Sequence, residues 1–172
     1  MNLIQINFNY KKSNEIEIEE GKNYSLYAYV DNDLLFYSTM DFNFWKKTKI
    51  KIFNKNDKLI LELQRKILFI ISLINNNFKI LFQTTGFIKN IIEINSDLIH
   101  FEENKKIIIQ SDSFLSFDLQ CSYILNGIKI GKVKQKNFWK SKRSFFVEID
   151  DNYLEYLEYI IIHFLANNTN DE

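Results

Sequence analysis

The segment Asp150–Ala166, DDNYLEYLEYIIIHFLA, decides the fold, because here the apolar residues stop alternating and begin to recur every three or four positions. This spacing predicts a helix over about residues 152–166, capped by Asp150, Asp151 or Asn152. Apart from Glu155, Glu158 and His163, the segment is apolar on every side, so it must be enclosed by protein or lipid. About 14 helical residues are too few to cross a bilayer, and we therefore expect a surrounding sheet.

Nearly all of the chain before this helix alternates apolar and polar residues with a period of two, which predicts a succession of short strands over about residues 3–149. Short polar clusters that suit tight reversals separate the runs. The clearest runs include Ile4 to Tyr10, Ile16 and Ile18, Phe78 to Phe82, Ile128 and Ile130, and Phe145 to Ile149. The clearest turns are Asp31-Asn32-Asp33 and Asn126-Gly127. Roughly a dozen antiparallel strands are predicted.

The composition fits one globular domain spanning residues 1–172, with a polar tail at 167–172. Net charge is zero, with 22 basic and 22 acidic residues, so no global field attracts nucleic acid, which we do not expect as a partner. A single cysteine, Cys121, is expected to be a buried apolar residue and favours a cytoplasmic location, with peripheral membrane attachment left open. No apolar run is long enough for a transmembrane segment.

The tetrapeptide Asn-Phe-Trp-Lys occurs at 43–46 and again at 137–140, and it contains both tryptophans of the chain. Sliding the sequence by 94 positions aligns the two copies without a gap and also places Asn32 on Asn126 and Asp57 on Asp151. A duplication of one half of the domain is the interpretation that we favour. Trp45 and Trp139 are then predicted to anchor the rim or the core of the fold.

Together, the strand around Gly131, the link Asn137-Phe138-Trp139, the strand 144–149, the acidic turn Asp150-Asp151 and the closing apolar helix resemble the tubby C-terminal-like superfamily. That superfamily includes tubby domains, phospholipid scramblases and LURP-one-related proteins. The resemblance implies a closed β-barrel of about twelve strands around a C-terminal hydrophobic helix. The helix of that family tends to use small residues, whereas this one carries Tyr153, Tyr156, Tyr159 and Phe164. The cysteine-rich and proline-rich segments of scramblases have no counterpart here, so scrambling is not implied.

A run without acidic residues lies between Asp118 and Glu148 and contains many lysines. With lysines of the first copy, it predicts a basic surface for anionic lipid headgroups or an acidic protein partner. The candidate residues are Lys46, Lys47, Lys132, Lys134, Lys140, Lys142 and Arg143. The alternative interpretation is a solvated lysine-rich face without a ligand.

No catalytic, cofactor-binding or metal-binding motif is apparent, and we expect no enzymatic activity and no cofactor. His163 is predicted to be a hydrogen-bonded core residue. A non-enzymatic binding module is therefore the first hypothesis. A purely structural or protein-interaction domain is the alternative, and an unrecognised hydrolytic enzyme is a more distant one.

Overall fold

The computed structural model describes residues 16–21, 25–43, 46–66, 77–84, 90–111, 120–135 and 144–169, and the predicted strand at Ile4 to Tyr10 and both tryptophans lie outside these ranges. The first six strands are β1 (Ile16–Glu20), β2 (Leu26–Val30), β3 (Asp33–Asn43), β4 (Lys46–Asn54), β5 (Leu59–Lys66) and β6 (Asn77–Gln83). The next six are β7 (Ile91–Ile94), β8 (Leu98–Phe101), β9 (Lys106–Ser111), β10 (Gln120–Leu125), β11 (Ile128–Gln135) and β12 (Ser144–Ile149). A short 3-10 helix, η2 (Glu102–Asn104), follows β8.

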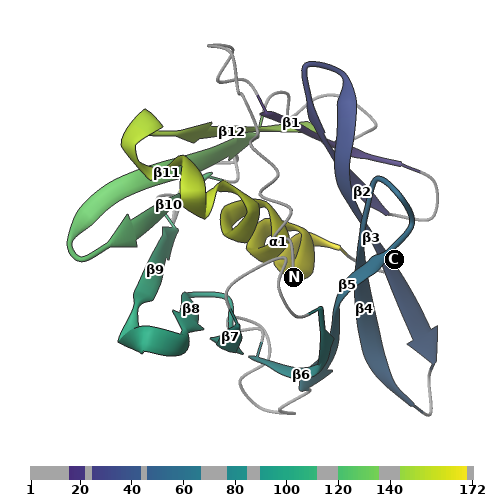
Figure 1. Ribbon diagram of the computed structural model, residues 1–172. Helices are drawn as coiled ribbons and strands as arrows, with labels where there is room; N and C mark the ends of the chain where they lie inside the picture. The colour runs from purple at the N-terminus through teal and green to yellow at the C-terminus, as the bar shows by residue number, and fades with distance from the viewer. Residues whose placement is uncertain are drawn as a thin grey trace, which may run out of the picture.

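The twelve strands of the described residues form one antiparallel sheet, in which strands consecutive in the chain are neighbours except for β6 and β7, which lie at the two ends of the sheet. Strand β12 returns to pair with β1, with Ile16 opposite Val147 and Ile18 opposite Phe145. This pairing curls the sheet into a nearly closed barrel (Figure 1). The predicted mainly-β fold of about twelve strands is confirmed.

At the two ends of the sheet, β6 and β7 are joined by hydrogen bonds from one side chain and not by a ladder of backbone hydrogen bonds. The Gln83 side-chain amide donates to the Ile91 carbonyl at 3.3 Å and accepts from the Ile91 N–H at 3.0 Å. A primary amide offers one donor and one acceptor in nearly the arrangement of a peptide group. Gln83 therefore replaces a backbone partner at the place where the two ends of the sheet meet.

Tight turns at one end of the barrel explain why consecutive strands pair. Asp31 and Asn32 join β2 to β3 with φ of 50° and 68°, and Asn126 and Gly127 join β10 to β11 with φ of 52° and 79°. Positive φ at both central positions is the conformation of the two-residue turns that match the twist of a hairpin. Both predicted turns are confirmed.

The apolar C-terminal segment runs through the middle of the ring of strands (Figure 1). It begins as the 3-10 helix η3 (Asp151–Tyr156), where the Asp150 carboxylate accepts from the Asn152 N–H at 2.9 Å, and continues as α1 (Leu157–Asn168). The predicted single helix thus begins in 3-10 geometry and ends two residues later than expected. Every α1 residue from Tyr159 to Ala166 is buried, as the all-round apolar pattern predicts.

Large aromatic side chains of the helix fit inside the barrel because aromatic rings of the strands pack against them. A glycine on one strand also leaves room for the helix. The Tyr159 ring meets Phe101 edge-on with centroids 4.5 Å apart, and Phe164 meets Phe145 at 4.8 Å. A Cβ on Gly131 would lie 2.9 Å from the Ile160 Cδ1. Glycine at this position therefore lets the helix approach β11.

Irregular pairings shift several side chains from the face that simple alternation predicts. Between β10 and β11 the register changes at Tyr123/Ile124, and Ile130 is fully buried whereas Ile128 is 53% exposed. Between β5 and β6 the register changes at Glu62/Leu63, and Phe82 is 43% exposed whereas Phe78 is buried. The prediction that Phe78 and Phe82 share one face was wrong, because the bulge between them reverses the alternation. Ile128 pairs with the buried Leu125, and it is exposed because it adjoins the turn at Asn126 and Gly127.

The strand register shows the internal repeat, but with a spacing of 95 residues within the strands rather than the predicted 94. Leu26 pairs with Ser38, and Cys121 pairs with Val133, so each residue of the second pair lies 95 positions after its counterpart. The bulges at 28/29 and 123/124 obey the same spacing. In the first copy, β3 has a further irregularity between Asp41 and Asn43. That extra residue reduces the spacing to the 94 positions seen at the tetrapeptide, so the gap-free alignment was wrong within the strands.

Candidate anion-binding surface

The described part of the chain includes the side chains of only some residues of the predicted basic surface. Lys132 and Lys134 lie on β11 and point outward, because Val133 between them is buried in the core. Lys46 and Lys47 belong to β4, although their side chains are outside the described part. Lys140, Lys142 and Arg143 also lie outside the described ranges.

The two strands that carry the described part of this surface do not adjoin. Going from β4 to β11 around the barrel crosses β3, β2, β1 and β12, which is five strand spacings. At about 4.8 Å per spacing, the strands are about 24 Å apart along the wall. The candidate lysines of β4 and those of β11 are therefore on strands that are well separated around the barrel.

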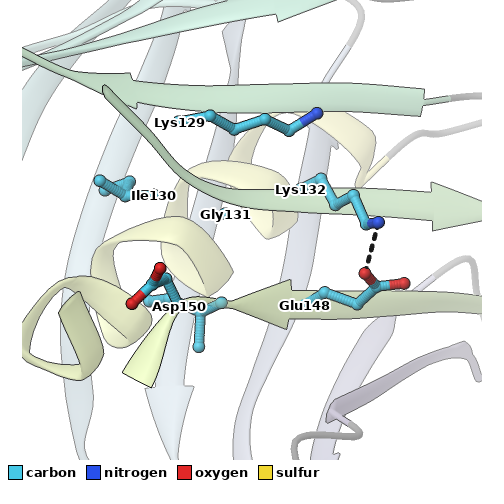
Figure 2. A pocket seen from close by; sticks show the side chains of 7 residues that line it. Lys129, Ile130, Gly131, Lys132, Glu148 and Asp150 are labelled. Carbon is cyan, nitrogen blue, oxygen red and sulfur yellow. Dashed lines mark ion pairs between the residues drawn. The ribbon is translucent and has the colours of Figure 1, made fainter. Parts of the chain in front are cut away.

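Around the outward lysines of β11 the surface is hollowed between β11 and β12, in a depression of about 230 Å³ (Figure 2). Four of its lining side chains are charged, and Figure 2 shows them on the two strands and at the entrance to η3. The lining residues are Lys129, Ile130, Gly131, Lys132, Glu148, Ile149 and Asp150.

Glu148 is a candidate site residue that was not among those predicted from the sequence. Its carboxylate lies 2.5 Å from the Lys132 Nζ and 3.8 Å from the Lys134 Nζ, with Lys132 directly opposite on the neighbouring strand. The hydrogen bond with Lys132 lowers the pKa of Glu148 and raises that of Lys132. The signal was present in the sequence, because Glu148 falls between the inward residues Val147 and Ile149 and must point outward.

The other carboxylate of the depression, that of Asp150, caps a helix. Asp150 accepts from both the backbone N–H and the side-chain amide of Asn152, each at 2.9 Å, and so caps η3. Glu148 makes no such contribution to a helix end. Of the two carboxylates, Glu148 is the one that can turn away from the depression without uncapping a helix.

Inside the barrel, His163 is buried, and both of its ring nitrogens make hydrogen bonds to surrounding residues. The Nε2 atom lies 2.8 Å from the Asn95 carbonyl oxygen, which can only accept, so Nε2 carries the hydrogen. The Nδ1 atom then accepts from the Tyr123 hydroxyl at 3.0 Å. Burial lowers the pKa of His163 to about 4. The prediction of a hydrogen-bonded core histidine is confirmed, whereas Cys121 is half-buried and not enclosed as expected.

The described residues contain no group of three or more His, Cys, Asp or Glu side chains that could hold a metal ion. Within the same ranges, none of the helices has the length and apolar character to span a membrane.

No protein-family model matches the chain, and comparison with curated proteins and with solved structures also gives no match.

Proposed function

We propose that this protein is a non-enzymatic binding module that holds a phosphate-type anionic group, such as a phospholipid headgroup, in the depression between β11 and β12. The observation that carries the proposal is the position of Glu148 against Lys132 and Lys134 at the edge of a hollowed surface. A carboxylate in contact with two ammonium groups occupies the place that a phosphate oxygen would take.

The charges around the depression favour an added anion. Lys129, Lys132 and Lys134 supply three positive charges, while Glu148 and Asp150 supply two negative ones. The site is thus cationic by one charge, and by two when Glu148 swings away into solvent. Glu148 is 52% exposed, so its displacement leaves no buried charge behind.

Vesicle flotation tests the proposal with phosphatidylcholine vesicles that either contain or lack phosphatidylserine, at low and at high salt. The wild type should float only with the anionic vesicles, and high salt should weaken this binding because the Debye length falls. The double variant Lys132→Ala/Lys134→Ala should lose binding. Glu148→Gln removes the competing carboxylate and should strengthen binding by about two- to five-fold, since an exposed ion pair contributes up to about 1 kcal/mol.

The matched control is Lys51→Ala on β4, where Lys51 pairs with Asp41 at 2.6 Å in a similar ion pair on the other side of the barrel. This variant should bind vesicles like the wild type. Equal binding by the wild type, the double lysine variant and Glu148→Gln would overturn the proposal. Binding to an acidic protein, with no vesicle binding, would favour the alternative interaction domain.

A further inference from the structure

The outer surface of β9, β10 and β11 carries positive charge that these strands do not themselves balance. The three strands contain four lysines and no acidic residue. The four are Lys106, Lys129, Lys132 and Lys134. On β4, by contrast, Lys51 contacts the carboxylate of Asp41 on the neighbouring β3 at 2.6 Å. An anionic partner is therefore favoured on the outer surface of β9 to β11.

Isoleucines lie on the same surface, next to these lysines. Ile108 on β9 pairs with Ile124 on β10, and Ile124 pairs with Lys129 on β11. Ile108 and Ile124 point outward, because the residues on either side of each of them are buried. Ile128 precedes Lys129 beside the hairpin turn and is 53% exposed, and Ile108 is 50% exposed. We call the surface formed by the four lysines and these three isoleucines the β9–β11 face.

The β9–β11 face is narrow enough to be nearly flat. Its three strands cover two strand spacings of a twelve-stranded sheet, or about 10 Å and roughly a sixth of the way around the barrel. Figure 1 shows these strands together on the side of the barrel away from β3, β4 and β5. A surface of this width curves little, so a planar partner can contact all of it.

We propose that the β9–β11 face lies on an anionic bilayer, so that the phosphate group in the depression between β11 and β12 is that of a membrane lipid. This inference rests on the proposed function, because it names the source of the bound anion. The lysines meet the headgroups, while Ile108 and Ile128 enter the interfacial region. A soluble phosphate would be held by the lysines alone and would leave both isoleucines in water.

Another exposed isoleucine lies in surroundings that do not suit an anionic membrane. Ile92 on β7 is 56% exposed, and the residue after it, Glu93, is also exposed. A carboxylate at this position would be repelled by anionic headgroups. Ile92 is therefore a matched control for Ile108 and Ile128, since it has the same side chain and a similar exposure.

Partitioning onto phosphatidylcholine vesicles that contain phosphatidylserine tests the proposal. Ile108→Ser and Ile128→Ser should each weaken partitioning by about three- to ten-fold, because a half-exposed isoleucine gains about half of the free energy of full burial. Ile92→Ser should partition like the wild type. Lys106→Ala, which lies outside the depression, should weaken partitioning by about five-fold through the loss of one lysine near the headgroups.

A soluble lipid separates failure of this inference from failure of the proposed function. Dibutyryl phosphatidylserine carries the same headgroup on chains short enough to stay in solution, and chemical-shift titration follows its binding. Ile108→Ser and Ile128→Ser should bind this lipid like the wild type. If they do, but also partition onto vesicles like the wild type, the membrane inference is overturned and the anion site stands. A wild type that binds neither the soluble lipid nor the vesicles would overturn both.

A spin label measures insertion independently of affinity. It is attached at Ile128→Cys or at Ile92→Cys, each in a Cys121→Ser background that removes the native thiol. On vesicle binding, the label at position 128 should become more accessible to oxygen and less accessible to a water-soluble nickel complex. The label at position 92 should not change. Labels that respond alike at the two positions would contradict insertion of the β9–β11 face.

Discussion

His163 and Glu158, two titratable residues of α1, should make the free energy of unfolding change with pH in opposite directions. Replacing each of them by glutamine should separate the two pH dependences. Burial lowers the pKa of His163 from 6.5 to about 4. The folded chain therefore binds this proton less readily than the unfolded chain does. The stabilisation from the neutral imidazole is complete above pH 6.5 and is lost as the pH falls toward 4.

The same reasoning gives the reverse sign for Glu158. Burial raises the pKa of its carboxyl group from 4.5 to about 7. The stabilisation from the protonated carboxyl is complete below pH 4.5 and is lost as the pH rises to about 7. At about 1.4 kcal/mol for each pH unit between the folded and unfolded values, His163 contributes about 3 kcal/mol. The partly exposed Glu158 contributes about 2 kcal/mol after allowance for solvent screening.

Between pH 4.5 and 6.5 the two contributions nearly cancel in the wild type. In His163→Gln only the Glu158 response remains, so the free energy of unfolding, relative to the wild type, should fall as the pH rises across this window. In Glu158→Gln the relative free energy should fall as the pH decreases. Urea unfolding at several pH values, with each variant compared with the wild type at the same pH, measures both differences.

Tyr123→Phe provides the control, because it removes the hydroxyl that donates to Nδ1 and keeps the imidazole. It should lower stability at every pH while the response of His163 persists. Curves for His163→Gln and Glu158→Gln that run parallel to the wild type would refute the reasoning, since the helix would then not be held in a low-dielectric interior.

Three further substitutions test the packing of the helix and the closure of the barrel. Gly131→Ala should destabilise the fold by about 1–3 kcal/mol in urea unfolding, because the new Cβ would meet Ile160 at 2.9 Å. Gln83→Ala should lower stability by about 1 kcal/mol and speed hydrogen exchange at the Ile91 amide, which loses its acceptor. Thr169→Val should cost about 1–3 kcal/mol, because its buried hydroxyl bonds the Leu165 carbonyl at 2.6 Å. An unchanged denaturation midpoint in any of these variants would contradict the corresponding contact.

Features that depend on neighbouring residues in the chain could be predicted from the sequence. The spacing of apolar residues after Asn152 identifies a helix that must be enclosed, and the Asx-rich turns at Asp31 and Asn126 identify tight hairpins. Asp150 was among the expected caps because its short side chain can reach the first free N–H groups of the helix. These local rules gave the mainly-β architecture and the place of the helix.

The candidate site depended on register, which alternation alone does not fix. Lys132 meets Glu148 only because β11 and β12 pair with these two residues opposite each other. A single bulge between Lys129 and Gly131 puts Lys129 on the outer face, although it lies an even number of residues before the inward Val133. A one-residue shift moves every later side chain to the other face of a strand, so the depression could not be derived beforehand.

Amide hydrogen exchange of α1 tests the central claim, the enclosure of this helix by the strands, most directly. An enclosed helix can exchange only when the barrel opens, so the amides of residues 160–166 should exchange as slowly as those of the paired strands β1 and β12. Exchange of these helix amides much faster than that of β1 and β12 would contradict the account, because the helix would then open to water while the wall stays intact.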